Sequence, residues 1–401
     1  MLIAGEASGD MLAAELVRAL RQELADAEAI PTTDYQPLHT NLAPRFFGAG
    51  GPQMAGAGVE LAFDMTTHAV IGLSEALKNY LKFRRLFHEL FRLALDRQPD
   101  AIICVDFSEF NRRFAHALRQ YTRGHADWFH DWDPRIIRYI SPQVWASREG
   151  RAFQMARDYD LVLSIFPFEK DWYAKRVPEL RVQFIGHPIV DRFPNGRGLR
   201  AGGLGEKRTP MVLLLPGSRP DEVRRHLPVM IGALGLIRAK VPNLRMRMVL
   251  PKESLVLQAK AFSLSEELEV QAGGLSESLA NADLAIAKTG TITMECAYFG
   301  VPTVALYKTS WSTWQIARHI VKVKYGAMPN LLANEEVFPE FIQDAARPQD
   351  IARASLELLC DESRRAGVKA RLAEIVASLG GPGAARRAAK AIMKTLAVEA
   401  D

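Results

Sequence analysis

Short apolar runs alternate with longer amphipathic stretches along most of this 401-residue chain, and this alternation strongly constrains its fold. It is typical of a parallel β-sheet whose strands are joined by helices. We predict strands over residues 2–4, 101–105, 136–140, 161–165 and 182–185, and then over 211–215, 245–250, 284–287 and 303–306. Helices are predicted over residues 11–24, 73–95, 224–240, 275–281 and 292–299. The chain is therefore expected to belong to the α/β class.

Glycines and charged residues without periodicity fill residues 192–210, a composition typical of a linker. This linker predicts a first domain over residues 1–191 and a second over residues 211–380. A Gly-Gly-Pro-Gly break at 380–383 precedes a last helix, 384–401, which is rich in Ala, Arg and Lys and could pack back on the first domain. Residues 119–134 are interpreted as an inserted loop.

The net charge of +5 at pH 7 mildly favours anionic partners, but it does not distinguish phosphates from nucleic acid or an acidic membrane face. The three cysteines lack the spacing of a zinc site or a disulfide framework, which favours a reducing compartment. The N-terminal residues lack the basic and apolar regions of a signal peptide, and no apolar run approaches the roughly 18 residues of a membrane span. We therefore expect a cytoplasmic protein whose membrane contact is peripheral.

Ligands of open α/β sheets bind beyond the carboxyl ends of the strands, so polar residues at those positions are candidates for a site. The first predicted strand leads into Gly-Glu-Ala-Ser-Gly-Asp, whose candidate binding residues are Glu6, Ser8, Gly9 and Asp10. Small residues let a ligand approach the backbone, and the N-terminus of the helix that follows attracts anions. The turn is not a GxGxxG fingerprint, so a dinucleotide is not favoured. The alternative is a tight turn capped by Ser8 or Asp10.

Asp106 directly follows the apolar strand predicted over residues 101–105. A carboxylate at such a position can face a ligand and act as a general base. Aspartate is also a favoured helix N-cap, so a capping role is the alternative interpretation of Asp106.

The second half of the chain has a turn suited to phosphate directly after the strand at 211–215. Its residues are Gly217, Ser218 and Arg219, and a glycine turn followed by a bidentate arginine can clamp a phosphate. The alternative for Arg219 is an ion pair with a nearby acid.

A second such turn holds Thr289, Gly290 and Thr291, where a strand ends and a helix begins. Exposed backbone amides at this kind of turn form an anion nest without a metal. Glu295, one turn into the helix, could hold ribose hydroxyls, and the alternative for the whole segment is a capping arrangement. A Walker motif does not occur. From the residues alone we predict a phosphate-bearing ligand between two α/β domains.

Eight short segments occur in the order typical of the lipid-A-disaccharide synthase family, which the chain resembles from about residue 4 to residue 343. They are Ala-Gly-Glu-Ala-Ser-Gly-Asp (4–10), Gly-Ala-Gly-Gly-Pro-Gln-Met (48–54), Tyr-Ile-Ser-Pro-Gln-Val-Trp-Ala (139–146), Phe-Pro-Phe-Glu-Lys (166–170), Phe-Ile-Gly-His-Pro (184–188), Leu-Leu-Pro-Gly-Ser-Arg (214–219), Thr-Gly-Thr (289–291) with Glu295, and Pro-Asn-Leu-Leu-Ala (329–333). The resemblance implies two Rossmann-like domains that face a cleft, the GT-B architecture, with UDP held mainly by the second domain.

The resemblance also implies a reaction. The family transfers 2,3-diacylglucosamine from UDP-2,3-diacylglucosamine to the 6-hydroxyl of 2,3-diacylglucosamine 1-phosphate, which gives a β-1,6-linked disaccharide 1-phosphate and UDP. Catalytic roles are implied for Asp106 as the base, for Arg219 and for Asn330. The chain departs from the family pattern at Ser108 and Glu109, where a proline and an aspartate are usual, but neither departure removes a residue with an assigned chemical role.

Inversion at the donor sugar needs one carboxylate base, because UDP leaves without a proton, and we expect no metal and no other cofactor. Asp-Trp-Asp at 131–133 and Asp-Tyr-Asp at 158–160 match the metal motif of another glycosyltransferase class. Residues 158–160 lie at the amino end of a predicted strand, so both motifs are interpreted as solvated turns. No aromatic and basic motif of a nucleic-acid binder is present, and no nucleic-acid partner is expected.

The segment that starts at Val70, Ile71 and Leu73 is apolar, with basic residues interleaved along the helix that follows. We predict that these three residues contact acyl chains or the membrane, whereas the bulk of the helix faces the core. The resemblance implies a peripheral protein on the inner face of the bacterial inner membrane, for which a homodimer is possible. The alternatives are another UDP-sugar transferase or epimerase of the same architecture, or a non-catalytic protein that binds nucleotide sugars.

Overall fold

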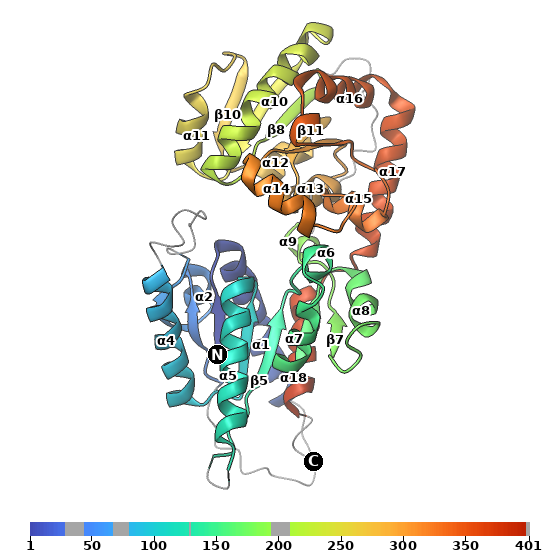
Figure 1. Ribbon diagram of the computed structural model, residues 1–401. Helices are drawn as coiled ribbons and strands as arrows, with labels where there is room; N and C mark the ends of the chain where they lie inside the picture. Colours follow the sequence, from blue (N-terminus) through green and yellow to red (C-terminus); the bar gives the residue numbers. More distant parts are fainter. Residues whose placement is uncertain (29–43, 67–79, 128–129, 194–208, 398–401) are drawn as a thin grey trace. The chain divides into compact units, whose positions relative to one another are not determined.

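The computed structural model describes residues 1–28, 44–66, 80–127, 130–193 and 209–397, and it divides the chain into two compact units (Figure 1). The first unit comprises Met1–Asp191 together with Gly381–Asp401, and the second comprises Arg192–Gly380. Each unit is built on one parallel sheet, so the predicted α/β class is confirmed. Most of the predicted linker lies outside the described residues.

The first unit has a seven-stranded sheet in the order β3-β2-β1-β4-β5-β6-β7. The strands are β1 (Leu2–Ala4), β2 (Phe47–Gly50), β3 (Glu60–Asp64), β4 (Ala101–Val105), β5 (Arg135–Tyr139), β6 (Leu161–Ser164) and β7 (Val182–Phe184). Successive side chains of a strand point to opposite faces, and Ile3 and Cys104 accordingly lie in one apolar cluster while Leu2 and Val105 lie in another. Both faces of the sheet are therefore buried, which explains the near-continuous apolar runs of its strands.

Helices cover both faces of this sheet. One face packs against α4 (Tyr80–Arg97), α5 (Ser108–His125), α7 (Arg151–Asp158) and α8 (Pro167–Ala174). The other face packs against α1 (Ala7–Glu28), α2 (Pro52–Gly56) and α18 (Ala384–Ala397). The short helices α6 (Val144–Ser147) and α9 (Ile189–Arg192) follow β5 and β7. Helix α18 lies against α1, so the last part of the chain completes the first unit (Figure 1).

Helix α4 faces the core, as predicted for the bulk of this segment. Leu86 and Leu90 are buried, and Phe87 packs its ring against Phe110 and Phe114 of α5. The basic residues Lys82, Arg84 and Arg85 of α4 are exposed. The candidate membrane contacts Val70, Ile71 and Leu73 lie outside the described residues.

The second unit has a six-stranded parallel sheet in the order β10-β9-β8-β11-β12-β13. The strands are β8 (Met211–Leu215), β9 (Arg245–Leu250), β10 (Leu268–Ala272), β11 (Leu284–Lys288), β12 (Thr303–Tyr307) and β13 (Glu340–Ile342). Helices α10 (Pro220–Lys240), α11 (Glu253–Lys260) and α16 (Pro348–Cys360) share one apolar cluster with the strands. The remaining helices are α12 (Leu275–Asn281), α13 (Thr291–Tyr298), α14 (Trp311–Ile320), α15 (Met328–Ala333) and α17 (Glu362–Ser378), with a short 3₁₀ turn at Gln343–Ala345.

Four strands, β2, β3, β10 and β13, were not predicted from the sequence. Strands β3, β10 and β13 are edge strands whose side chains are mostly half-buried or exposed, so they lack a continuous apolar run. Strand β2 contains two glycines, and a Cβ at Gly48 would lie 1.9 Å from the carbonyl oxygen of Leu2. The close approach of β2 to β1 therefore needs a residue that disfavours strands.

The inserted loop predicted over residues 119–134 is wrong in its first half, because α5 continues to His125. The continuation places Arg119 where its guanidinium pairs with Asp133 and Asp160. Arg119 is almost fully buried, so the helix is extended by an ion pair that sequence periodicity does not reveal.

Strand order reverses direction once in each unit, between β1 and β4 in the first and between β8 and β11 in the second. The connections from such neighbouring strands leave toward opposite sides, which opens a crevice at their carboxyl ends. Asp106 and the turn at residues 5–10 follow β4 and β1, while the turns at 216–219 and 289–291 follow β8 and β11. Each unit thus gathers the candidate residues of these turns at its switch point.

Glu169, at the start of α8, is fully buried and accepts hydrogen bonds from Trp145 Nε1 (3.0 Å) and the Phe166 amide (3.2 Å). Burial raises the pKa of Glu169 to about 7, although these hydrogen bonds oppose the rise. Since the folded state holds this proton more tightly than the unfolded chain, the contribution of Glu169 to stability should be largest below its ordinary pKa of 4.5. It should fall as the pH rises from the ordinary value of 4.5 to about 7.

We predict that the free energy of unfolding of the wild-type protein falls by on the order of 3 kcal/mol between about pH 5 and about pH 8 because of Glu169, and that this fall is absent in Glu169→Gln. Urea unfolding at several pH values measures this slope independently of any constant offset that the substitution introduces. Glu179→Gln is the matched control, since Glu179 is exposed. An equal slope in wild type and Glu169→Gln would show that Glu169 does not titrate in this range.

Candidate functional site

The switch point of the first unit brings the turn after β1 next to the loop after β4. A Cβ built on Gly9 would lie 3.7 Å from the Cβ of Asp106 and 3.6 Å from the Val105 carbonyl oxygen. Glu6 and Ser8 of the same turn are exposed, whereas Gly9 is buried. The sequence prediction therefore placed two separate segments correctly at one edge of the sheet.

The loop that carries Asp106 has an unusual backbone. Asp106 and Phe107 both adopt left-handed conformations, with φ of 43° and 47°. Each such residue costs roughly 1–3 kcal/mol, and strain of this kind gathers at functional sites. The loop is fixed by the amide of Asp106, which donates to the Tyr139 carbonyl oxygen at 3.1 Å.

Asn111 holds this loop from beneath and was not assigned a role from the sequence. It is fully buried, and its Nδ2 donates to the carbonyl oxygens of Asp106 (2.9 Å), Val105 (3.2 Å) and Ile3 (3.3 Å). One side chain therefore connects the ends of β1 and β4. The signal available in the sequence was a polar residue at a helix position that faces the core.

The carboxylate of Asp106 does not cap α5. The N-cap position is Phe107, and no side-chain hydrogen bond is made there. Asp106 itself is half-buried, and within the described part of the chain no residue hydrogen-bonds its carboxylate. The capping alternative is therefore not what the structure contains.

Asp10 caps a helix, but the helix is α2 rather than its own α1. The carboxylate is buried and accepts from the amides of Gly51 (2.8 Å), Gln53 (2.9 Å) and Met54 (3.0 Å). These amides belong to the start of α2, where they have no intrahelical acceptor. Asp10 thus joins two segments that are far apart in the sequence, and its predicted contact with a ligand stays a prediction.

In the second unit, Glu222 ties the two turns of the switch point together. Its carboxylate accepts from the Ser218 amide (2.9 Å) and pairs with Lys288 Nζ (3.1 Å), at the end of β11. Burial acts to raise the pKa of Glu222, but the charge of Lys288 and the Ser218 amide outweigh it and lower the pKa. Glu222 is therefore ionised and holds the loop after β8 against β11.

Arg219 remains largely free for a ligand. Its side chain is 72% exposed, and its guanidinium lies 3.9 Å from Glu222. The ion pair proposed as the alternative exists, but it is long and contributes little at such exposure.

His226 of α10 fixes the same loop from the core side and was not predicted. Its Nδ1 donates to the Pro216 carbonyl oxygen (2.7 Å), and its Nε2 accepts from the Lys308 amide (3.0 Å). Burial lowers the pKa of His226, so the neutral ring that this pair of bonds requires is favoured. The loops after β8 and β12 are thereby held in register.

The turn of Thr289, Gly290 and Thr291 leads into α13, and Gly290 has a φ of 120°. The first amides of a helix have no intrahelical acceptor and point outward, which suits an anion. Thr293 is buried, donates its hydroxyl to the Gly290 carbonyl oxygen (2.6 Å) and accepts from the Met328 amide (3.1 Å). Glu295 is half-buried; burial raises its pKa, and the charge of Arg192 opposes the rise.

Asn330 is fully buried and all of its hydrogen-bonding capacity is used within the second unit. Its Nδ2 donates to the Phe338 carbonyl oxygen and to Glu340 Oε1, both at 2.7 Å. Its Oδ1 accepts from the amides of Val337 (2.9 Å) and Phe338 (2.7 Å). In this arrangement Asn330 fixes the chain around α15, and a direct contact with a reacting group would require it to give up one of these bonds.

Among the described residues, no group of three His, Cys, Asp or Glu side chains is placed to hold a metal ion. The Asp-Tyr-Asp motif lies at the amino end of β6, where Asp158 contacts His116 (3.1 Å) and Asp160 accepts from the Ile136 amide (2.7 Å). These carboxylates are engaged in structural contacts rather than in solvated turns.

Gly217 has a φ of 137°, and a Cβ there would lie 2.5 Å from Glu222 Oε2. We predict that Gly217→Ala lowers the free energy of unfolding by about 1–3 kcal/mol, because it combines backbone strain with a clash at the carboxylate that holds the loop. Urea denaturation measures this change. Gly235→Ala is the control: it lies in α10, nothing lies within 4 Å of the added Cβ, and helix propensity favours it. Equal stabilities of the two variants would contradict the prediction.

Three comparisons place the chain among known proteins. The model of the lipid-A-disaccharide synthetase family matches residues 1–394. A lipid-A-disaccharide synthase of Alkalilimnicola ehrlichii is 33% identical over 98% of this chain and 97% of its own length. That of Anaeromyxobacter dehalogenans (strain 2CP-C) is 34% identical over 98% of this chain and 96% of its own length.

Solved structures share the fold at low identity. A calicheamicin glycosyltransferase has a TM-score of 0.56 at 15% identity and covers all of this chain, with 97% of its own length matched. A UDP-GlcNAc 2-epimerase from Neisseria meningitidis, bound to UDP-GlcNAc, has a TM-score of 0.56 at 11% identity and covers 96% of this chain and 97% of its own. These likenesses show the fold alone. The match along nearly the whole sequence shows more: this chain belongs to the lipid-A-disaccharide synthase family.

Proposed function

We propose that the chain transfers 2,3-diacylglucosamine from UDP-2,3-diacylglucosamine to the 6-hydroxyl of 2,3-diacylglucosamine 1-phosphate. The products are the β-1,6-linked disaccharide 1-phosphate and UDP. The observation that carries this proposal is the family match over residues 1–394. The two switch points support it, since one presents a carboxylate and the other presents groups suited to a diphosphate.

The donor is proposed to bind at the switch point of the second unit. The exposed guanidinium of Arg219 and the amides at the start of α13 would stabilise the charge that grows on the diphosphate as the sugar leaves. Preorganised donors of this kind are worth about 3–4 kcal/mol each in a transition state. The half-buried carboxyl of Glu295 would accept from the ribose hydroxyls, and Gly217, Ser218, Thr289 and Gly290 would shape the loops.

Asp106 is proposed as the general base. A carboxylate within hydrogen-bond reach of the acceptor 6-hydroxyl would take its proton as the oxygen attacks the anomeric carbon from the face opposite UDP. The strained backbone at Asp106 and Phe107, held by Asn111, supports this role because it fixes the direction of the side chain. Asn330 would act as a positioning residue, given that its amide is saturated. Glu6, Ser8, Gly9 and Asp10 would line the acceptor side.

Two other functions share the architecture. UDP-sugar epimerases and other transferases of this fold are disfavoured by the family match, and the low identities to such structures give them no support beyond the fold. A non-catalytic nucleotide-sugar-binding protein is disfavoured by the presence of Asp106, Arg219 and Glu295 together. A transfer assay that compares radiolabelled acylated UDP-glucosamine with radiolabelled non-acylated UDP-glucosamine as donors distinguishes these functions by their products.

Among the described residues, no helix has both the length and the apolar character needed to cross a bilayer. We propose that the protein binds peripherally at the inner face of the inner membrane, where its acylated substrates reside, through Val70, Ile71 and Leu73.

Asp106→Asn should lower the rate of disaccharide formation by about 10²–10⁴-fold, because it removes the base while keeping the side-chain volume. UDP affinity, measured by calorimetry, should stay within a factor of about two because Asp106 is not in the proposed UDP site. Asp131→Asn, an exposed position in the same unit, should retain full activity. Near-normal turnover of Asp106→Asn would remove it from the role of base.

Replacement of Val70, Ile71 and Leu73 by serine should release the protein from vesicles that contain anionic lipid, since each buried methylene adds about 0.8 kcal/mol to membrane affinity. Cosedimentation measures the bound fraction. Replacement of the exposed Val321 by serine serves as a control for loss of apolar surface elsewhere. Unchanged cosedimentation of the triple variant would show that the anchor lies at another position.

A further inference from the structure

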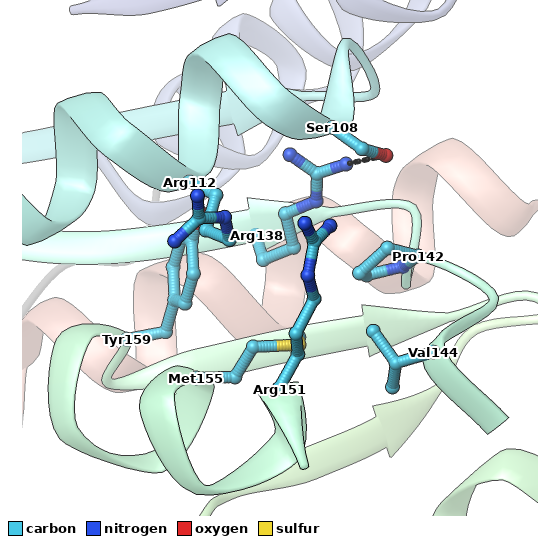
Figure 2. Close-up of a pocket in the computed structure, with 8 residues that line it drawn as sticks. All are labelled: Ser108, Arg112, Arg138, Pro142, Val144, Arg151, Met155 and Tyr159. Carbon is cyan, nitrogen blue, oxygen red and sulfur yellow. Dashed lines mark hydrogen bonds between the residues drawn. The ribbon is translucent and has the colours of Figure 1, made fainter. Parts of the chain in front are cut away.

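A pocket in the first unit lies between the start of α5, the end of β5 and helix α7. Three arginines line it, Arg112, Arg138 and Arg151, together with Ser108 at the first turn of α5 (Figure 2). No role was assigned to these arginines from the sequence, and the proposed mechanism does not use them.

Arg138 is a buried charge with neutral partners. It is 1% exposed, and its Nε donates to the Ile140 carbonyl oxygen and its Nη2 to Ser108 Oγ, both at 3.1 Å. Within the described residues, no carboxylate forms an ion pair with it. A buried guanidinium without a counter-ion is unfavourable, and the fold keeps one here at the edge of a pocket.

The other two arginines share a single acid. Glu109 accepts from Arg112 (2.7 Å) and Arg151 (3.0 Å), and also from Arg113 (3.1 Å), which does not line the pocket. The Nε of Arg112 is buried and has no hydrogen-bond partner. Three guanidinium groups therefore line the pocket, and the carboxylate that pairs with two of them, Glu109, is also shared with Arg113, so the lining carries an excess of positive charge.

The pKa shifts within the cluster show how closely these charges interact. Burial lowers the pKa of Arg151, and repulsion by Arg148 and Arg112 adds to the effect, although Glu109 opposes it. Glu109 itself has a pKa of about 2: burial acts to raise it, but the hydrogen bonds from Arg112 and Arg113 outweigh burial. The carboxylate is thus already ionised, and the remaining positive charge is available to a ligand.

We propose that this pocket binds a phosphate monoester, and that it is the subsite for the 1-phosphate of the acceptor sugar. A phosphate monoester carries a charge of about −1.5 to −2 at neutral pH, which would offset the excess positive charge of the lining, and guanidinium groups bind its oxygens bidentately. Ser108 stands two residues after Asp106, so an anchored phosphate would hold the acceptor beside the base. This inference rests on the proposed function, which supplies an acceptor with a phosphate at one end and a reacting hydroxyl at the other.

The test compares Arg151→Gln and Arg112→Gln with Arg113→Gln in the full chain. Arg113 is the matched control because it lies on the same helix and contacts the same acid, but its side chain is 63% exposed and outside the pocket. Transfer is measured with the acceptor 1-phosphate and with its dephosphorylated analogue. We expect wild type and Arg113→Gln to prefer the phosphorylated acceptor. The two pocket variants should raise the KM for it by about 10- to 100-fold, lose most of that preference and keep the donor KM.

Two kinetic results would overturn the proposal. One is an unchanged preference for the phosphorylated acceptor in both pocket variants. The other is a raised KM for the UDP donor with an unchanged acceptor KM, which would assign the pocket to the donor diphosphate. Arg138→Lys, which keeps the buried charge, distinguishes bidentate binding from charge alone, since it should raise the acceptor KM without affecting the donor KM.

A binding measurement separates this inference from the proposed function. With saturating UDP present to occupy the proposed diphosphate site at Arg219, inorganic phosphate should further raise the Tm of the wild-type protein and of Arg113→Gln, but not that of Arg151→Gln. If phosphate stabilises the protein in this Arg151-dependent way but no disaccharide is formed, the proposed function is contradicted and the anion site is supported. Equal stabilisation of wild type and Arg151→Gln by phosphate would sink the anion site, whatever the transfer assay shows.

Discussion

The parallel pairing of β1 with β4, and of β8 with β11, is the constraint on which both candidate sites depend. Parallel strands end at the same edge of the sheet, and at these two pairs the chain leaves in opposite directions. Segments that are far apart in the sequence, such as those of Gly9 and Asp106, therefore come within contact distance. The chemistry of each site is set by the few residues that follow these four strands.

Buried polar side chains hold those residues in place. Asn111 fixes the strained loop of Asp106, Glu222 and His226 fix the loop of Arg219, and Asn330 fixes the chain around α15. Each hydrogen bond contributes only about 0.5–1.5 kcal/mol net, but a buried partner left unsatisfied costs more than that. The supports are therefore sensitive to substitution even though none of them is proposed to touch a reacting atom.

The central strands of both sheets were predictable because burial on both faces gives them continuous apolar runs, as in β4 and β8. The edge strands β3, β10 and β13 were not, since their half-exposed faces resemble loops. Positions after strands identified Asp106, Arg219 and the turn at 289–291, but not what each side chain contacts. Asp10 and Asn330 illustrate the limit. The sequence made Asp10 a candidate binding or capping residue, and the family resemblance implied a catalytic role for Asn330, but their hydrogen-bond partners lie in segments whose proximity only the fold establishes.

Helix α18 has a consequence for how the chain reaches its native state. Ala388, Ala389 and Ile392 are buried in the core of the first unit, and the amides of Gly383 and Ala384 donate to Asp191. The N-terminal part of the chain is synthesised first, but the helical layer formed by α1 and α18 is complete only after α18 has been synthesised. The second unit is contiguous in sequence and has no such delay. A truncated fragment ending at residue 191 would expose apolar surface on β5, β6 and α1, and would be prone to aggregation during biosynthesis.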